Sequence, residues 1–248
     1  MENPRAYHSP ATAIRRLRGL LADLGPVQTV VSLVSFIDDR YIKSFDRRYN
    51  VQTSGFIPLD TTTFEVARLT DATQYGPVNA WGFRKLLARL DLPRDAHFVD
   101  LGCGLGRACI IAAEYGFEKV TGVDLAAEFC EQATQNISDC KPPSGTLTPV
   151  TILHMDAVDY CDSTDGDVIF MYRPFSGAFL KQVLNKLVAR ARSRRKTITV
   201  IYSERAASHG EAESIASIPS FPEIAHTISW GQEFYVFRCA HDSAETPA

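Results

Sequence analysis

The residues best suited to chemistry lie in one short stretch, where an acidic side chain precedes three closely spaced glycines. Residues 98–101 form a short apolar run typical of a buried strand, interrupted only by Asp100. Gly102, Gly104 and Gly106 follow, and glycine permits positive φ and lets a ligand approach the backbone. The pattern then turns helical, and a helix N-terminus offers unpaired N–H groups. This strand, turn and helix predict a site for a nucleoside-containing ligand.

The spacing of the glycines separates two kinds of nucleotide site. A dinucleotide-binding turn reads Gly-x-Gly-x-x-Gly, whereas this turn reads Asp-x-Gly-x-Gly-x-Gly over positions 100–106. An acidic side chain so close to the turn suits an ammonium or sulfonium group better than an anionic pyrophosphate. The sequence therefore favours a ligand that carries positive charge beside its nucleoside.

Two further predicted strands end in acidic residues. The strand over 119–124 ends in Asp124, roughly 20 residues beyond the turn, the distance at which α/β nucleotide sites hold ribose hydroxyls. The strand over 150–156 ends in Asp156. Either acid alone is also consistent with a helix N-cap. Three acidic strand ends after one glycine turn are more typical of a ligand site.

This arrangement resembles the class I S-adenosylmethionine-dependent methyltransferases. Their first motif is similar to the turn that starts at Asp100, and its acidic residue helps to position the amino group of the cofactor. The resemblance implies that Asp124 and the adjoining Leu125 hold the ribose. It also implies that the Asp156 side chain meets the adenine amino group and that the Ala157 amide meets an adenine ring nitrogen.

The residues after the fourth predicted strand, 167–171, are expected to meet the methyl acceptor. They read Tyr172-Arg-Pro-Phe175, and ligands of open α/β sheets lie outside the carboxyl ends of the strands. Amine methyltransferases often carry Asn-Pro-Pro-Tyr or Asp-Pro-Pro-Tyr there. Tyr172 and Arg173 are the catalytic candidates, with Tyr172 shaping or hydrogen-bonding the reacting group. Arg173 would either clamp an acceptor that bears a carboxylate or phosphate, or point to solvent.

A narrower resemblance, to a group of small bacterial class I methyltransferases, covers about residues 45 to 205. Its marks are the segment from Phe45 to Gly55, Tyr75-Gly-Pro77, Arg107 and the Tyr-x-Pro-Phe element, at whose second position that group usually has Asn. In the family, residues like Tyr75 help to cover the methionine end of the cofactor. The alternative role for Tyr75 is an aromatic anchor for the helix predicted over 78–90.

The rest of the chain completes an α/β domain. An alternating pair at 223–230 and 234–239, with a turn at 231–232, predicts a final antiparallel hairpin, which most dinucleotide-binding dehydrogenases lack. The resemblance implies a seven-stranded sheet of order 3-2-1-4-5-7-6 with its last strand antiparallel. We expect a helical extension or lid over 1–50, the methyltransferase domain over 51–240 and a disordered tail over 241–248.

Composition narrows the classes of function. The chain has 248 residues, 45% of them hydrophobic, and a net charge of −3, as expected of an ordinary soluble protein. Its six cysteines show no Cys-x-x-Cys pattern, so neither a metal site nor a disulfide framework is indicated. The start of the chain lacks a secretory signal and the apolar run at 27–37 is too short to span a bilayer, which favours a cytoplasmic protein. The basic run at 190–196 is better explained by a helix C-terminus than by nucleic acid.

The predicted function is methyl transfer from S-adenosyl-L-methionine to an N, O or C nucleophile of a small-molecule, peptide or protein acceptor. Two alternatives stay open. One is a binding protein of the same fold without transferase activity, for which Arg173 is the main support. The other is a dinucleotide-dependent oxidoreductase, which the glycine spacing and the hairpin oppose. His154 and His226 could act as bases by residue type alone, although a structural histidine is more common.

Overall fold

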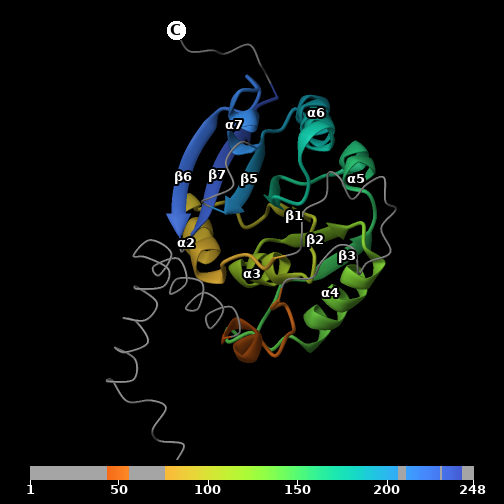
Figure 1. The fold of residues 1–248 in the computed structure, drawn as a ribbon, viewed down its shortest axis with the longest axis vertical. Helices are drawn as coiled ribbons and strands as arrows, with labels where there is room; N and C mark the ends of the chain where they lie inside the picture. Colours follow the sequence, from red (N-terminus) through yellow and green to blue (C-terminus); the bar gives the residue numbers. More distant parts are fainter. Residues whose placement is uncertain (1–43, 56–75, 206–210, 230, 242–248) are drawn as a thin grey trace, which may run out of the picture. The chain divides into compact units, whose positions relative to one another are not determined.

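The described part of the chain folds around a seven-stranded sheet (Figure 1). The computed structural model describes residues 44–55, 76–205, 211–229 and 231–241. The strand order is β3-β2-β1-β4-β5-β7-β6, which confirms the predicted topology. The strands are β1 His97–Leu101, β2 Lys119–Asp124, β3 Val150–His154, β4 Val168–Tyr172, β5 Ile198–Arg205, β6 Glu223–Ser229 and β7 Gln232–Cys239.

Strands β1 to β5 run parallel, and β7 is antiparallel to both β5 and β6. The interior strand β1 is buried along its whole length, as expected where helices cover both faces of a parallel sheet. All carboxyl ends of the parallel strands therefore meet at one edge of the sheet. The glycine turn and the Tyr172 element both lie at that edge.

Helices cover the two faces of the sheet (Figure 1). One apolar cluster joins α2 and α3 to one face, and a second joins α5, α6 and α7 to the other. Residues 44–49 form a further short helix, which belongs to the same compact unit as the sheet. The helices are α2 Ala80–Leu90, α3 Arg107–Tyr115, α4 Ala127–Asp139, α5 Ala157–Ser163, α6 Gly177–Arg194 and α7 Glu211–Ala216.

Three details differ from the sequence-based expectation. Gln232 is the first residue of β7 and pairs with Arg205, so it is not part of the hairpin turn. Strand β3 ends at His154, two residues earlier than expected. The short helices α5 and α7 were not predicted, because helices of seven and six residues carry too few turns to show a period.

Several expectations fall on residues outside the described part of the chain. They include Tyr75, the helices expected before residue 44 and most of the expected tail. In the described part, no helix combines the length and hydropathy that crossing a bilayer requires.

Candidate active site

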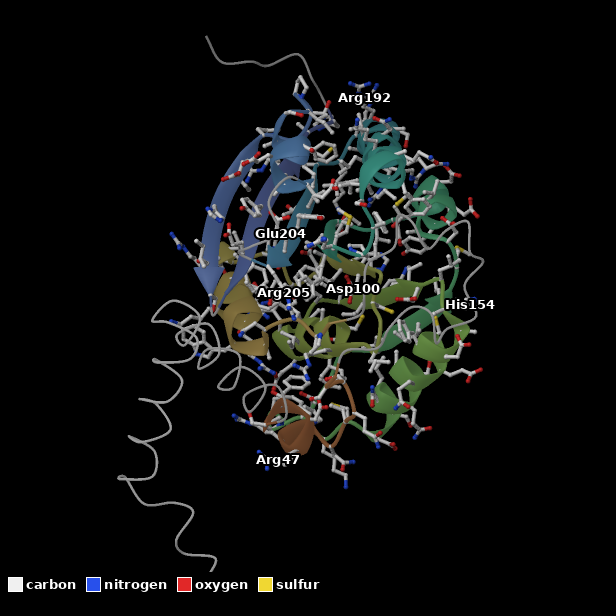
Figure 2. All side chains as sticks on the ribbon, in the orientation of Figure 1. Arg47, Asp100, His154, Arg192, Glu204 and Arg205 are labelled. Carbon is white, nitrogen blue, oxygen red and sulfur yellow. The ribbon has the colours of Figure 1, made fainter. Side chains whose placement is uncertain are left out.

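Two buried carboxyl groups lie side by side at the carboxyl edge of the sheet. Asp100 is the penultimate residue of β1 and pairs with Gly122 of the neighbouring strand, while Asp124 is the last residue of β2. Both side chains are buried. Figure 2 shows Asp100 within the sheet region and His154 toward its β3 side. The parallel pairing of β1 with β2 thus brings together two acids that are 24 positions apart in the sequence.

The carboxylate of Asp124 holds the glycine turn. Its Oδ2 accepts a hydrogen bond from the Gly104 amide at 2.8 Å, and its Oδ1 accepts one from the Ala126 amide at 3.0 Å. Burial raises the pKa of Asp124, and these amide hydrogen bonds offset part of that effect. Each carboxylate oxygen has a second acceptor position, so two hydroxyl groups of a ligand could also be bound.

The buried carboxyl group of Asp100 accepts fewer hydrogen bonds than that of Asp124. Within the described part of the chain, its one recorded hydrogen-bond donor is the Cys109 thiol, 3.6 Å from Oδ2, and no cation is paired with it. Burial, with a smaller contribution from the nearby Asp124 charge, raises the pKa of Asp100 from 3.8 to about 8. A buried carboxyl group of this kind gains most from a cationic partner. The geometry therefore suits an ammonium group beside the turn.

The turn itself requires glycine. Gly102, Gly104 and Gly106 all have positive φ, of 79°, 50° and 83°. A Cβ at Gly102 would lie 2.3 Å from the Cβ of Pro174, so the loop after β4 packs directly onto the turn. This contact places the Tyr172-Arg-Pro-Phe175 element next to the predicted cofactor turn.

Arg173 has a strained backbone. Its φ is 39°, in the left-handed region, although it is neither glycine nor asparagine and it precedes Pro174. Such a conformation costs about 1–3 kcal/mol and is often found at functional positions. Tyr172, half-buried, ends β4 beside Ser203, and Phe175 is buried against Phe179. The two catalytic candidates thus lie at the carboxyl edge of the sheet, at its centre.

Part of the chain is similar in sequence to known proteins. A family model described as a methyltransferase domain matches residues 98–197. This part of the chain is similar to a methyltransferase domain, and the strand order is that of the class I methyltransferase fold. A protein of Bacillus subtilis (strain 168) named as a methyltransferase, YqeM, is 45% identical over 51 residues, which are 21% of this chain and only 20% of the relative.

Two solved structures have a similar fold. The ribosomal protein L11 methylase from Lactobacillus delbrueckii subsp. bulgaricus is 16% identical with a TM-score of 0.52, over 67% of this chain and 81% of that one. MtNAS in complex with MTA and tNA is 15% identical with a TM-score of 0.52, over 65% of this chain and 60% of that one. At these identities the likeness is one of fold.

The third acidic residue that the sequence predicts for the site, Asp156, is a helix cap. Asp156 precedes α5, and its Oδ1 accepts a hydrogen bond from the Val158 amide at 2.7 Å. Ala157 is the first residue of that helix, where a backbone N–H has no partner within the helix. The Leu125 carbonyl lies 3.0 Å from Nε2 of His154. The structure thus gives Asp156 the capping role that the sequence left open.

His226, considered as a possible base, and the basic run at 190–196 both have partners elsewhere in the fold. His226 lies 3.0 Å from the Glu233 carboxylate on the outer hairpin. In the basic run, Arg190 donates to the Thr164 carbonyl, and both Arg194 and Lys196 pair with Asp167. These cations join α6 to the amino edge of the sheet, away from the glycine turn.

Several polar residues near the turn had no role assigned from the sequence. Arg107 follows the turn directly and is 2% exposed, which is unusual for an arginine. It contacts Asp46 and Thr53, and Asn136 of α4 contacts Gln52 and the turn. The sequence marked Arg107 and the segment from Phe45 to Gly55 only as part of a family resemblance, and a further local signal is that an arginine at a helix N-terminus is opposed by the helix dipole.

Proposed function

We propose that the protein transfers a methyl group from S-adenosyl-L-methionine to an N, O or C nucleophile held at Tyr172 and Arg173. The observation that carries this proposal is the buried Asp100 carboxyl group at the edge of the glycine turn, which has a raised pKa and no cationic partner among the residues that the structure describes. An ammonium group of the cofactor would supply the missing positive charge. The fold and the match to a methyltransferase domain support the same conclusion.

The remaining cofactor contacts follow from the same edge of the sheet. Asp124 would bind the ribose hydroxyls while it keeps the turn in place, and Leu125 would lie beside the ribose. Asp156 and the Ala157 amide would contact the adenine. Tyr75 is retained as a candidate for the methionine end, although it lies outside the described residues. The structural neighbour that was solved with MTA shows that a related fold binds that ligand.

The domain's contribution to the reaction is alignment in a dry site. The methyl group is already activated on the sulfonium of the cofactor, so the residues of the chain chiefly bring the acceptor into line with it. Pro174 fixes the acceptor loop against Gly102, so the cofactor turn and the acceptor loop are held in one geometry. Tyr172 would contact the reacting group and Arg173 would select the acceptor. The acceptor would be a small molecule, a peptide or a protein side chain.

The backbone of Arg173 gives a second explanation for the Asn that we expect at this position in similar proteins. Asn tolerates the left-handed region better than Arg. Position 173 would then be selected for the φ of 39° and not only for substrate contact. Variants at this position must therefore be assayed for stability as well as for kinetics.

The decisive experiment is calorimetric titration with S-adenosylhomocysteine and, in parallel, with NAD. We expect binding of the first and none of the second. NAD binding alone would favour an oxidoreductase and refute the proposal. Transfer of labelled methyl from the cofactor into an extract of the native host, with mass identification of the product, then tests turnover. Binding without any labelled product would identify a binding protein that lacks transferase activity.

A further inference from the structure

A buried arginine joins the glycine turn to a segment far away in the sequence. Arg107 is the first residue of α3 and follows Gly106 directly. Its Nε donates to Thr53 Oγ1 at 2.7 Å, and its Nη2 donates to Asp46 Oδ1 at 3.0 Å and to Ser54 Oγ at 3.3 Å. A buried charge is costly unless it is paired, and the helix dipole disfavours a cation at this end. Arg107 therefore depends on the distant segment for its partners.

Asp46 shapes that segment from within. Its Oδ2 accepts hydrogen bonds from the Thr53 amide at 2.8 Å and from the Ser54 amide at 2.7 Å. Its Oδ1 accepts one from Thr53 Oγ1 at 2.6 Å. The same carboxylate pairs with Arg107, so one ion pair connects both ends of the segment 46–54 to the residue behind the turn.

Asn136 makes a second connection from α4. Its side chain is 2% exposed, its Oδ1 accepts from the Gln52 amide at 2.8 Å, and its Nδ2 donates to the Gln52 carbonyl at 3.1 Å. The same Nδ2 donates to the carbonyl of Leu105, within the glycine turn, at 2.9 Å. A displacement of the segment would thus deprive the buried side chains of Arg107 and Asn136, both next to the turn, of these hydrogen bonds, which is costly.

We propose that Arg107 is a positioning residue that couples segment 46–54 to the glycine turn, so that cofactor binding and the placement of this segment form one cooperative event. The inference rests on the proposed function, because it takes the turn to be the cofactor site. It extends that site beyond residues 98–197. Since coupling is reciprocal, a ligand that holds the turn must also stabilise the hydrogen bonds of the segment.

The test compares two variants that loosen the same segment from the same helix. Arg107→Lys keeps the charge but loses the forked guanidinium that reaches three partners at once. Tyr49→Phe is the matched control, because the Tyr49 hydroxyl binds Glu114 at 2.7 Å near the other end of α3, away from the turn. Each full-length variant is titrated with S-adenosylhomocysteine, and its unfolding free energy is measured separately.

We expect Arg107→Lys to weaken binding about tenfold or more and Tyr49→Phe to stay within about threefold of the parent, whatever their stabilities. In the parent, saturating ligand should slow hydrogen exchange of the Gln52, Thr53 and Ser54 amides at least about tenfold. The coupling would be refuted, and the proposed function would stand, if Arg107→Lys bound the ligand with parental affinity. The same holds if hydrogen exchange of these amides in the parent did not change when the ligand was added. A parent that does not bind the ligand would overturn the proposed function and the coupling together.

Discussion

Replacing Asp100 by Asn should change stability and cofactor binding in opposite directions. In the folded protein, burial raises the pKa of this carboxyl group to about 8, against 3.8 for an exposed aspartate. A raised pKa contributes stability only while the group is protonated, so stability is lost as pH rises from about 4 to about 8. At pH 7 this loss is about 4 kcal/mol. The Asn variant avoids this loss, but its buried, unpaired amide donor lowers its own stability by about 1–3 kcal/mol.

We therefore expect the Asn variant without ligand to be more stable than the parent by about 1–3 kcal/mol at pH 7 in urea unfolding. The advantage should shrink by about 1.4 kcal/mol for each pH unit down to pH 5, because the parent carboxyl group is then protonated in the folded state. Binding of S-adenosylhomocysteine should weaken about tenfold or more, since a hydrogen bond to a charged group is worth about 1.5–3 kcal/mol. Calorimetric titration of the same samples gives this second value.

Asp124→Asn is the matched control, because this carboxylate accepts two backbone hydrogen bonds and the Asn side chain can accept only one of them. We expect this variant to lose about 1–3 kcal/mol of stability. An Asp100→Asn protein that has native circular dichroism but is less stable than the parent at pH 7 would refute the reasoning about burial. Parental affinity for S-adenosylhomocysteine in that variant would refute the ammonium site.

Other substitutions and conditions address the same edge of the sheet. Asp124→Ala should raise the Kd for S-adenosylhomocysteine at least about tenfold, and an unchanged Kd in a folded variant would contradict the ribose assignment. The Kd of the parent should fall as pH rises from 6 to 8, because Asp100 must lose its proton to pair with the ammonium group; calorimetry that finds a flat Kd would count against this. Gly102→Ala should cost about 2–4 kcal/mol in urea unfolding, since its Cβ would overlap Pro174 at a positive φ; a change below about 0.5 kcal/mol would contradict this. Arg173→Asn should match or exceed the stability of the parent and Arg173→Val should lose about 1–2 kcal/mol, whereas equal unfolding curves would show that φ at this position carries no strain.

The glycine turn and the strands could be predicted because their signals are local, whereas the order of the strands followed from the resemblance to class I methyltransferases. A short apolar run, an acid and three glycines specify a strand and a turn whatever surrounds them, and the later strands repeat the pattern. The same locality explains what the sequence left open. Asp156 carries equal signals for a strand-end ligand and for a helix cap, and α5 is too short for its period to decide between them.

The chain by itself thus determined the elements and the residue types at their ends. Only the tertiary structure decided how those residues are used, because hydrogen-bond partners and burial come from segments far apart in the sequence. Arg107 donates hydrogen bonds to Thr53, 54 positions away in the sequence, and to Asp46, 61 positions away. These partners compensate a buried cation that the helix N-terminus alone would disfavour. The burial that raises the pKa of Asp100 and the φ of Arg173 are likewise products of packing, since neither a low-dielectric environment nor a strained backbone can be inferred from local sequence.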